Sequence, residues 1–415
     1  GDAGGAPGED AGPALPPEPD PDLGPDSRPS DYPDADDWED PPALGEDDEC
    51  CVLGALVLVA RRYEGTALAH EPPRIEWGPG VWGLLVTRHF SDLAPDAPRA
   101  VLIYQLSAAG EPLGEPHVFD APSPGEDEPI AQALRYAEGR WAIAVSGASV
   151  EGNLREMHTR LFDRELVPAS AWLPIGVAQV WLVDLVRLSH GDRWLGIIAA
   201  GDTLGVSPFG ELGVDPLVEH RASAPRAVDA VGLRSRVAVL LSQTAESAAH
   251  NELVVVGPGP GYSVLGRVEL ASRYGAFASL AGLRDFVVAA GIEDGHVSVE
   301  VIDPFALEGV AAPRSIGDVP VDGRDAVSVA ASSKFGLAGV CYGFSRDTSG
   351  RPTDSRVEFR LVGPDGAPRG RAVTVVESPF RGGVVNCAVG TDDVGFLVGW
   401  WDGTGLWVRR VDIAR

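Results

Sequence analysis

The chain has 415 residues, of which 44 % are hydrophobic, and a formal net charge of −28 at pH 7. A nucleic-acid-binding surface needs clustered Lys and Arg to displace counterions, so this charge argues against a nucleic-acid partner. It also argues against direct binding to an anionic membrane surface. The hydrophobic content is ample for a core, and the 51 glycines and 35 prolines favour a fold with many turns.

Residues 1–49 hold more than half of the net negative charge. They carry 17 acidic side chains against one basic side chain, Arg28, together with eleven prolines and almost no β-branched residues. Such a segment cannot bury enough apolar surface to offset its chain entropy, so we predict a disordered acidic Pro-rich linker. Its opening, GDAGGAPGED, is similar to the tether after the lipidated Cys of bacterial lipoproteins. We therefore expect an extracytoplasmic protein of the periplasm, outer membrane or cell surface, with a lipid anchor upstream of Gly1 as a hypothesis.

The run VLGALVLVA at 52–60 is too short to span a bilayer as a helix. Instead, we predict a strand over residues 53–62, with no pairing partner of its own nearby in the sequence.

One motif then recurs seven times between residues 50 and 415. It consists of a polar turn, a large apolar anchor residue and an apolar run that ends in Gly or a polar cluster. A short strand precedes each anchor strand, and a third and a fourth strand follow it. The third strand alternates, so that odd positions in 297–301 and 357–361 are predicted to point inward and even positions outward. The anchors are Trp82, Trp141, Trp194, Val237, Phe286, Phe335 and Phe396.

Seven four-stranded units without long helices predict an all-β, seven-bladed β-propeller over residues 50–415. A twisted sheet that is apolar on both faces gains stability only between two neighbours, and a closed ring supplies them. The last unit, which ends in LWVRRVDIAR, lacks a fourth strand. We expect residues 53–62 to supply that strand and close the ring.

The stretch DDVGFLVGWWDG, with Phe396, Leu397, Val398 and Trp400, resembles the units of bacterial extracytoplasmic, lipoprotein-like β-propellers. The resemblance covers residues 50–415 and concerns architecture alone, because that group has no shared catalytic set. A composition rich in Ala, Gly, Arg, Asp and Val, with a single Lys, is typical of a high-GC bacterial genome.

Binding on such a scaffold is expected in the loops at one end of the ring. The longest loop, 342–356, holds charged residues that could form a recognition tip or simply be solvated. Histidines and carboxylates of other loops would form a metal or acid–base site only if they converged around the channel. These candidate loop residues are Arg346, Asp347, Arg351, Asp354, His89, Asp92, Asp294 and His296.

The roles of the cysteines and of five tryptophans are each open to two interpretations. Cys341 and Cys387 lie one repeat apart in strand-like runs, so they form a disulfide between neighbouring units or are two small buried hydrophobes. Adjacent Cys50 and Cys51 could each pair elsewhere. The tryptophans either pack between blades or stack on sugars: Trp172, Trp181, Trp400, Trp401 and Trp407.

Two functions remain in view. The first is a non-enzymatic extracytoplasmic binding or scaffold protein, tethered by the acidic linker, with a protein or complex as its partner. The second is a carbohydrate-binding or carbohydrate-active propeller that uses the mouth of the channel. We expect no cofactor, no metal and no catalytic set, because no catalytic or metal-ligand motif occurs in the sequence. Carboxylates gathered beside exposed Trp would favour the second function, and a channel of Gly, Ala and Pro the first.

Overall fold

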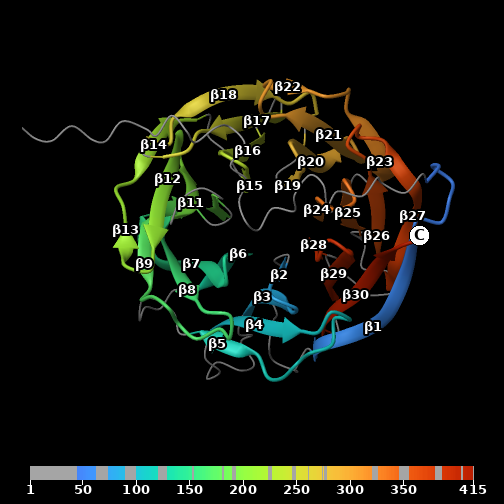
Figure 1. Cartoon of the computed structure of the whole chain (residues 1–415), viewed down its shortest axis with the longest axis horizontal. Helices are drawn as coiled ribbons and strands as arrows, with labels where there is room; N and C mark the ends of the chain where they lie inside the picture. The colour runs from blue at the N-terminus through green and yellow to red at the C-terminus, as the bar shows by residue number, and fades with distance from the viewer. Residues whose placement is uncertain are drawn as a thin grey trace, which may run out of the picture.

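The computed structural model of the chain shows seven antiparallel sheets arranged as a ring around a central axis (Figure 1). This confirms the predicted all-β, seven-bladed propeller. The structure describes residues 44–61, 73–88, 100–119, 129–151, 154–179, 182–188, 193–222, 227–244, 249–259, 261–272, 274, 278–319, 326–344, 355–378, 386–402 and 405–414.

The first three blades follow one another around the ring, each running from an inner to an outer strand. Blade 1 contains β2 (Arg74–Trp77), β3 (Trp82–Arg88), β4 (Ala100–Leu106) and β5 (His117–Phe119). Blade 2 contains β6 (Ile130–Ala137), β7 (Arg140–Glu151), β8 (Leu154–Phe162) and β9 (Leu173–Gln179). Blade 3 contains β10 (Val183–Arg187), β11 (Trp194–Ala200) and β12 (Thr203–Gly210), with two short outer strands, β13 (Gly213–Val214) and β14 (Val218–Arg221).

The remaining blades repeat this order. Blade 4 contains β15 (Ala227–Leu233), β16 (Arg236–Thr244), β17 (Ala249–Val256) and β18 (Val264–Glu269). Blade 5 contains β19 (Ser279–Leu283), β20 (Phe286–Glu293), β21 (His296–Asp303), β22 (Glu308–Gly309) and β23 (Arg314–Asp318). Blade 6 contains β24 (Ala326–Ser332), β25 (Leu337–Phe344), β26 (Ser355–Val362) and β27 (Pro368–Ser378). Blade 7 contains β28 (Cys387–Thr391), β29 (Gly395–Asp402), β30 (Gly405–Ile413) and β1 (Cys51–Arg61).

The anchor residues begin or closely follow the start of the second strand in six blades, and Phe335 lies in the turn just before β25. The side chains of these strands are buried on both faces, because each blade lies between two others. In β26 the predicted alternation holds, since Val357, Phe359 and Leu361 are buried while Glu358 and Arg360 are partly exposed.

In β21 the even positions of 297–301 lie on the face opposite the odd ones, but the prediction that they point outward to solvent is wrong. Ser298 and Glu300 of β21 are both buried. The Glu300 carboxylate accepts hydrogen bonds from the backbone N–H groups of Ala271 and Ser272, at 3.3 and 3.2 Å. The outward face of β21 is thus covered by the neighbouring blade 4, which supplies partners for its polar side chain.

The N-terminal strand closes the ring. β1 runs antiparallel to β30, from Cys51 opposite Ile413 to Arg61 opposite Gly405, and it is the outer strand of blade 7 (Figure 1). The last blade is therefore built from both ends of the described chain, as predicted from its missing fourth strand.

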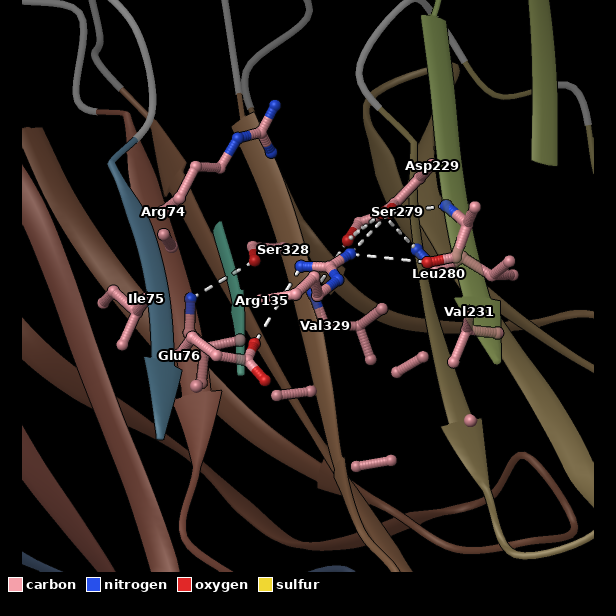
Figure 2. Close-up of a pocket in the computed structure, with 18 of the residues that line it drawn as sticks. Arg74, Ile75, Glu76, Arg135, Asp229, Val231, Ser279, Leu280, Ser328 and Val329 are labelled. Atoms are coloured by element: carbon pink, nitrogen blue, oxygen red, sulfur yellow. Dashed lines mark hydrogen bonds and ion pairs between the residues drawn. The ribbon is translucent and has the colours of Figure 1, made fainter. Parts of the chain in front are cut away.

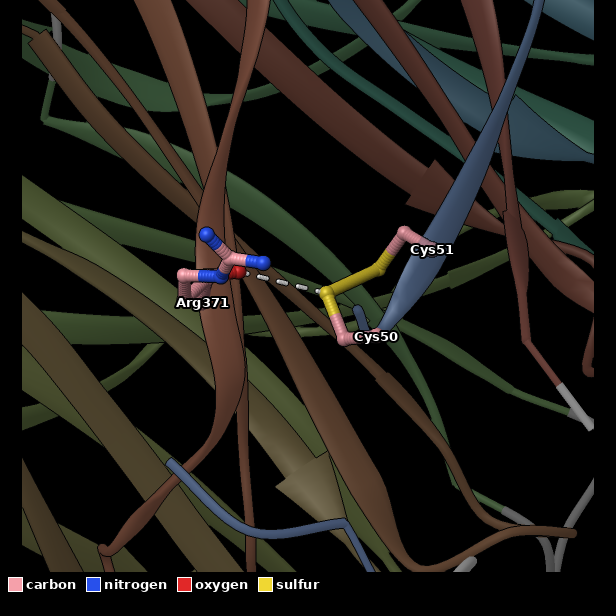
Figure 3. Close-up of a disulfide and its surroundings, with 3 residues drawn as sticks. All are labelled: Cys50, Cys51 and Arg371. Carbon is pink, nitrogen blue, oxygen red and sulfur yellow. Dashed lines mark hydrogen bonds between the residues drawn. A yellow bond between two sulfur atoms is a disulfide. The ribbon is translucent and has the colours of Figure 1, made fainter. Parts of the chain in front are cut away.

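The residues just before β1 fasten the same seam to blade 6. Gly370 and Arg371 of β27 donate backbone hydrogen bonds to the carbonyls of Gly45 and Asp48, at 3.0 and 2.9 Å. Cys50 is fully buried, and its sulfur contacts the Arg371 carbonyl at 3.4 Å (Figure 3). Cys50 and Cys51 are joined to each other by a disulfide. Residues 44–51 thus bridge the outer strands of blades 6 and 7.

We predict that removal of the closing strand prevents stable folding. A chain that starts at residue 62 leaves β30 with an unpaired edge and uncovers the apolar side of blade 7, so it should aggregate and lose its cooperative thermal transition. The matched control is a chain that starts at residue 44, which keeps β1 and should retain both properties. Size-exclusion chromatography and thermal melts followed by circular dichroism measure this. A monomeric, cooperatively melting chain from residue 62 would contradict it.

Candidate binding site in the central channel

The inner strands of all seven blades surround a central cavity of about 400 Å³. This volume lies within the range of small-molecule sites. Backbone and small side chains of Ala, Gly and Val form most of its wall, and only a few charged residues interrupt them. The charged residues come from β2, β6, β10 and β15, which belong to blades 1 to 4.

A chain of side-chain-to-backbone hydrogen bonds joins neighbouring inner strands. Asp184 Oδ2 accepts the N–H of Ala230 and Asp229 Oδ2 accepts the N–H of Leu280, both at 2.8 Å. Farther round the ring, Ser279 Oγ accepts the N–H of Val329 at 3.3 Å, and Ser328 Oγ accepts the N–H of Val389 at 3.2 Å. An innermost strand has no sheet partner on its channel side, so these oxygens satisfy backbone groups that would otherwise lack a partner.

Figure 2 shows Arg135 of β6 between Glu76 and Asp229, and Asp184 adds a third carboxylate. Its Nη2 is 2.8 Å from Asp184 Oδ2 and 3.6 Å from Asp229 Oδ1, while Nη1 is 4.0 Å from Glu76 Oε2. Arg135 also donates hydrogen bonds to the backbone carbonyls of Leu134 and Ala230. We call Glu76, Arg135, Asp184 and Asp229 the channel cluster. Burial alone would lower the pKa of Arg135, but the charges of Asp184, Glu76 and Asp229 raise it above its usual value.

Two carboxyl groups of the channel cluster have a pKa raised to about 7. Burial raises the pKa of Glu76 from 4.5 to about 7, against the Arg135 charge and a hydrogen bond from the Tyr136 backbone, both of which lower it. Burial also raises the pKa of Asp229 from 3.8 to about 7; the nearby Asp184 adds to this shift and Arg135 opposes it. The cluster therefore becomes more negative as the pH rises through 7.

The three carboxylates of the channel cluster differ in how many hydrogen bonds they accept from the scaffold. Asp184 Oδ1 accepts the N–H of Leu185, and its Oδ2 accepts from Arg135 and Ala230. Asp229 Oδ1 accepts the N–H of Ala230, and its Oδ2 accepts from Ser279 and Leu280. Among the described residues, Glu76 accepts one backbone hydrogen bond, from Tyr136, and pairs with Arg135 at 4.0 Å, and its side chain is 27 % exposed. Glu76 is thus the carboxyl group best placed to meet a ligand.

The wall of the cavity is asymmetric where the inner strands lie beside the anchor residues of the second strands. Trp77 and Tyr136 line the cavity from blades 1 and 2, and each ring packs on the anchor of its own blade, Trp82 and Trp141. The corresponding position of blade 3 is Arg187, opposite the anchor Trp194, and those of blades 4 to 7 are Gly232, Gly282, Ala331 and Gly390. At Gly390 a Cβ would meet Ile75 at 2.8 Å, so glycine is needed where blades 7 and 1 approach. At this level the wall is therefore aromatic or charged in blades 1 to 3 and is lined by small residues in blades 4 to 7.

Most of the predicted loop candidates lie outside the described residues: Arg346, Asp347, Arg351, Asp354, His89 and Asp92. Asp294 forms a two-residue turn with Gly295 between β20 and β21, where both have positive φ, 49° and 82°. This is the backbone that such hairpins need and that Asp-Gly adopts readily. His296 Nδ1 lies 2.7 Å from Asp318 Oδ1, and both side chains are exposed, so the pair contributes little to stability. Neither residue reaches the channel cluster.

The other sequence candidates are mainly structural where they are described. Trp400 and Trp401 are buried, which confirms packing for these two, whereas Trp172 and Trp407 are partly exposed and Trp181 is outside the described residues. Cys341 and Cys387 are both buried and lie side by side. Among the residues described, no group of three or more His, Cys, Asp or Glu is arranged to hold a metal ion, and no helix is long and apolar enough to cross a bilayer.

The channel cluster was not predicted, although the sequence carries a signal for part of it. A single polar residue recurs within four consecutive apolar inner strands, at Asp184 in VDLV, Asp229 in VDAV, Ser279 in ASLA and Ser328 in VSVA. A recurring polar residue in a buried strand indicates a required hydrogen bond. Glu76 and Arg135 have no counterpart in the other units and could be found only from the structure.

Comparisons with known proteins support the fold. Neither a family model nor a curated protein matches the sequence. The chain is similar in structure to the phage phi92 endosialidase, with a TM-score of 0.54 and 8 % identity over 87 % of this chain and 69 % of that one. The WD40 domain of Toxoplasma gondii coronin gives a TM-score of 0.48 at 12 % identity, over 89 % of this chain and 90 % of that one. At such identities the first likeness shows the propeller fold alone.

We predict that Glu76 makes stability depend on pH. Its carboxyl group holds a proton more tightly in the folded chain, with a pKa of about 7, than in the unfolded chain, with a pKa of 4.5. Its contribution is therefore complete below pH 4.5 and is lost as the pH rises through 7. Glu76→Gln should remove up to about 3 kcal/mol of this pH-dependent loss, at about 1.4 kcal/mol per pKa unit.

Urea unfolding at pH 5 and pH 8 measures the effect. The exposed Glu308 provides the control, since Glu308→Gln should leave the difference in unfolding free energy between the two pH values unchanged. Equal pH dependence in Glu76→Gln and the unsubstituted chain would show that Glu76 is not the titrating group.

Proposed function

We propose that this protein is a non-enzymatic extracytoplasmic binding protein that holds a small polar ligand in its central cavity. The observation that carries this proposal is the channel cluster, in which the Asp184 and Asp229 carboxylates are bonded to the scaffold while Glu76 keeps exposed surface in the cavity. Such a site is rigid before the ligand arrives, which lowers the entropic cost of binding.

The same bonds argue against hydrolysis. A two-carboxylate glycosidase needs one carboxyl group as acid and a second as nucleophile or base, and both must reach the substrate. Here the oxygens of Asp184 and Asp229 already accept backbone, hydroxyl or guanidinium hydrogen bonds. Glu76 combines a raised pKa with fewer hydrogen bonds to the scaffold than Asp184 or Asp229, and one such carboxyl group suits binding better than cleavage.

The charge of the cluster indicates the ligand. With Glu76 and Asp229 ionised, three negative groups surround Arg135, and Arg74 and Arg187 also line the cavity. These charges offset one another, so a polar ligand with several hydrogen-bonding groups is favoured over a simple anion or cation. The wall of Trp77 and Tyr136 offers an aromatic surface to an ammonium group or to the apolar face of a sugar.

The extracytoplasmic location rests on two features. The composition of residues 1–49 fits a tether that holds a domain away from a surface, and a lipid anchor upstream of Gly1 would provide the attachment. The Cys50–Cys51 disulfide fits an oxidising compartment. With the loops at the ends of the ring, the tethered propeller would also present a surface to a protein partner or complex.

A carbohydrate ligand is the second candidate. The gathered carboxylates and the Trp77 and Tyr136 wall favour it, whereas the Gly and Ala half of the channel favours the broader binding function. The two candidates share one site and differ in the ligand and in whether a bond is broken.

A ligand screen tests both candidates. We expect a member of a panel of amines, amino acids, monosaccharides and disaccharides to raise the melting temperature of the full chain. Glu76→Gln should weaken its binding by about tenfold or more, since a hydrogen bond to a charged group contributes about 1.5–3 kcal/mol. Glu308→Gln is again the matched control, and titration calorimetry gives the dissociation constants.

Mass spectrometry of the recovered ligand separates a binder from an enzyme. An unchanged ligand after long incubation agrees with binding, and cleavage of a disaccharide would favour a carbohydrate-active enzyme. Binding that is equally strong in Glu76→Gln would place the ligand elsewhere on the propeller.

A further inference from the structure

Two buried cysteines face each other across the seam between blades 6 and 7. Cys341 lies in β25, the second strand of blade 6, and Cys387 begins β28, the innermost strand of blade 7. Both residues are fully buried, and their Sγ atoms are 2.8 Å apart. A disulfide bond is about 2.05 Å long, so the sulfur atoms need to approach by less than about 1 Å.

The surroundings hold the two sulfurs together. Cys341 and Cys387 belong to one apolar cluster with Phe359, Val389 and Trp400, which leaves little room for either side chain to turn away. Next to them, Ser328, the residue opposite Cys341 in blade 6, accepts the backbone N–H of Val389 in blade 7. This bond fixes the inner strands of the two blades at the level of the cysteines.

We infer that Cys341 and Cys387 form a disulfide that links blade 6 covalently to blade 7. This inference concerns the covalent state of the chain and does not depend on the ligand proposed for the channel. It would reinforce the seam at its inner strands, where residues 44–51 already bridge its outer strands.

An external disulfide is the oxidant that forms this bond. A thiolate of one cysteine attacks a disulfide of the glutathione or thiol-oxidoreductase class, and the second cysteine displaces that partner from the mixed disulfide. Two S–H bonds of the chain break and one S–S bond forms, while the S–S bond of the oxidant breaks and takes up the two electrons and the two protons to give two thiols. Burial raises the pKa of the Cys341 thiol well above its usual value, so the reaction belongs to folding, before blade 7 covers blade 6.

Peptide mapping under non-reducing conditions tests the link. The full chain is refolded with reduced and oxidised glutathione, alkylated while denatured and digested with trypsin. We expect peptide 335–346, which contains Cys341, to be joined to peptide 382–409, which contains Cys387, and to separate on reduction. Recovery of both cysteines as alkylated thiols from a chain with a native melting transition would overturn the inference.

The variant Cys50→Ser/Cys51→Ser isolates the proposed link from the neighbouring disulfide. It should keep the joined peptides, and a reducing agent should lower its melting temperature by about 5 °C, because a cross-link closing a loop of this length constrains the unfolded chain. The further replacement Cys341→Ala should abolish that sensitivity. A melting temperature of the Cys50→Ser/Cys51→Ser variant that does not respond to reduction would also overturn the inference.

Discussion

The pairing of β1 with β30 is the contact on which the rest of the ring depends. Each blade is apolar on both faces, so it is stable only between two neighbours, and the seventh blade has a complete set of four strands only when the N-terminal strand joins it. Because this blade comes from two distant parts of the chain, ring closure must await the last residues. Residues 44–51, which hydrogen-bond to β27, strengthen the seam where this late assembly occurs.

Closure of the ring also leaves backbone groups of the inner strands without a sheet partner, and this shapes the channel. Seven inner strands face the axis with backbone groups that no further strand can pair. The polar side chains of Asp184, Asp229, Ser279 and Ser328 meet this need by reaching to the next blade. Two of these four are carboxylates, and Arg135 offsets part of their charge. The polar centre of the channel is thus first a part of the scaffold, and Glu76 adds to it a carboxyl group with surface in the cavity.

This arrangement separates architecture from function. A propeller provides a rigid, hollow ring, and the same ring serves unrelated activities, so likeness in shape to an endosialidase at 8 % identity carries no activity with it. Functional meaning lies in the few residues that break the repeat. Glu76, Arg135, Trp77 and Tyr136 gather on the side of blades 1 and 2, opposite a wall of small residues. That asymmetry gives the channel one polar and aromatic half on which a ligand can be oriented.

The number of blades, the strand order and the closing role of the N-terminal strand could be predicted from the sequence, because repetition and apolar patterning are local properties of the chain. The sequence also carries a signal for the hydrogen bonds between neighbouring inner strands, since Asp184, Asp229, Ser279 and Ser328 recur at one position in their strands. The folded ring was needed to show that Glu76 pairs with Arg135, that Glu300 is buried and that Cys341 faces Cys387. These pairs join residues from different blades, and their burial depends on how twisted sheets pack around an axis, which no local pattern encodes.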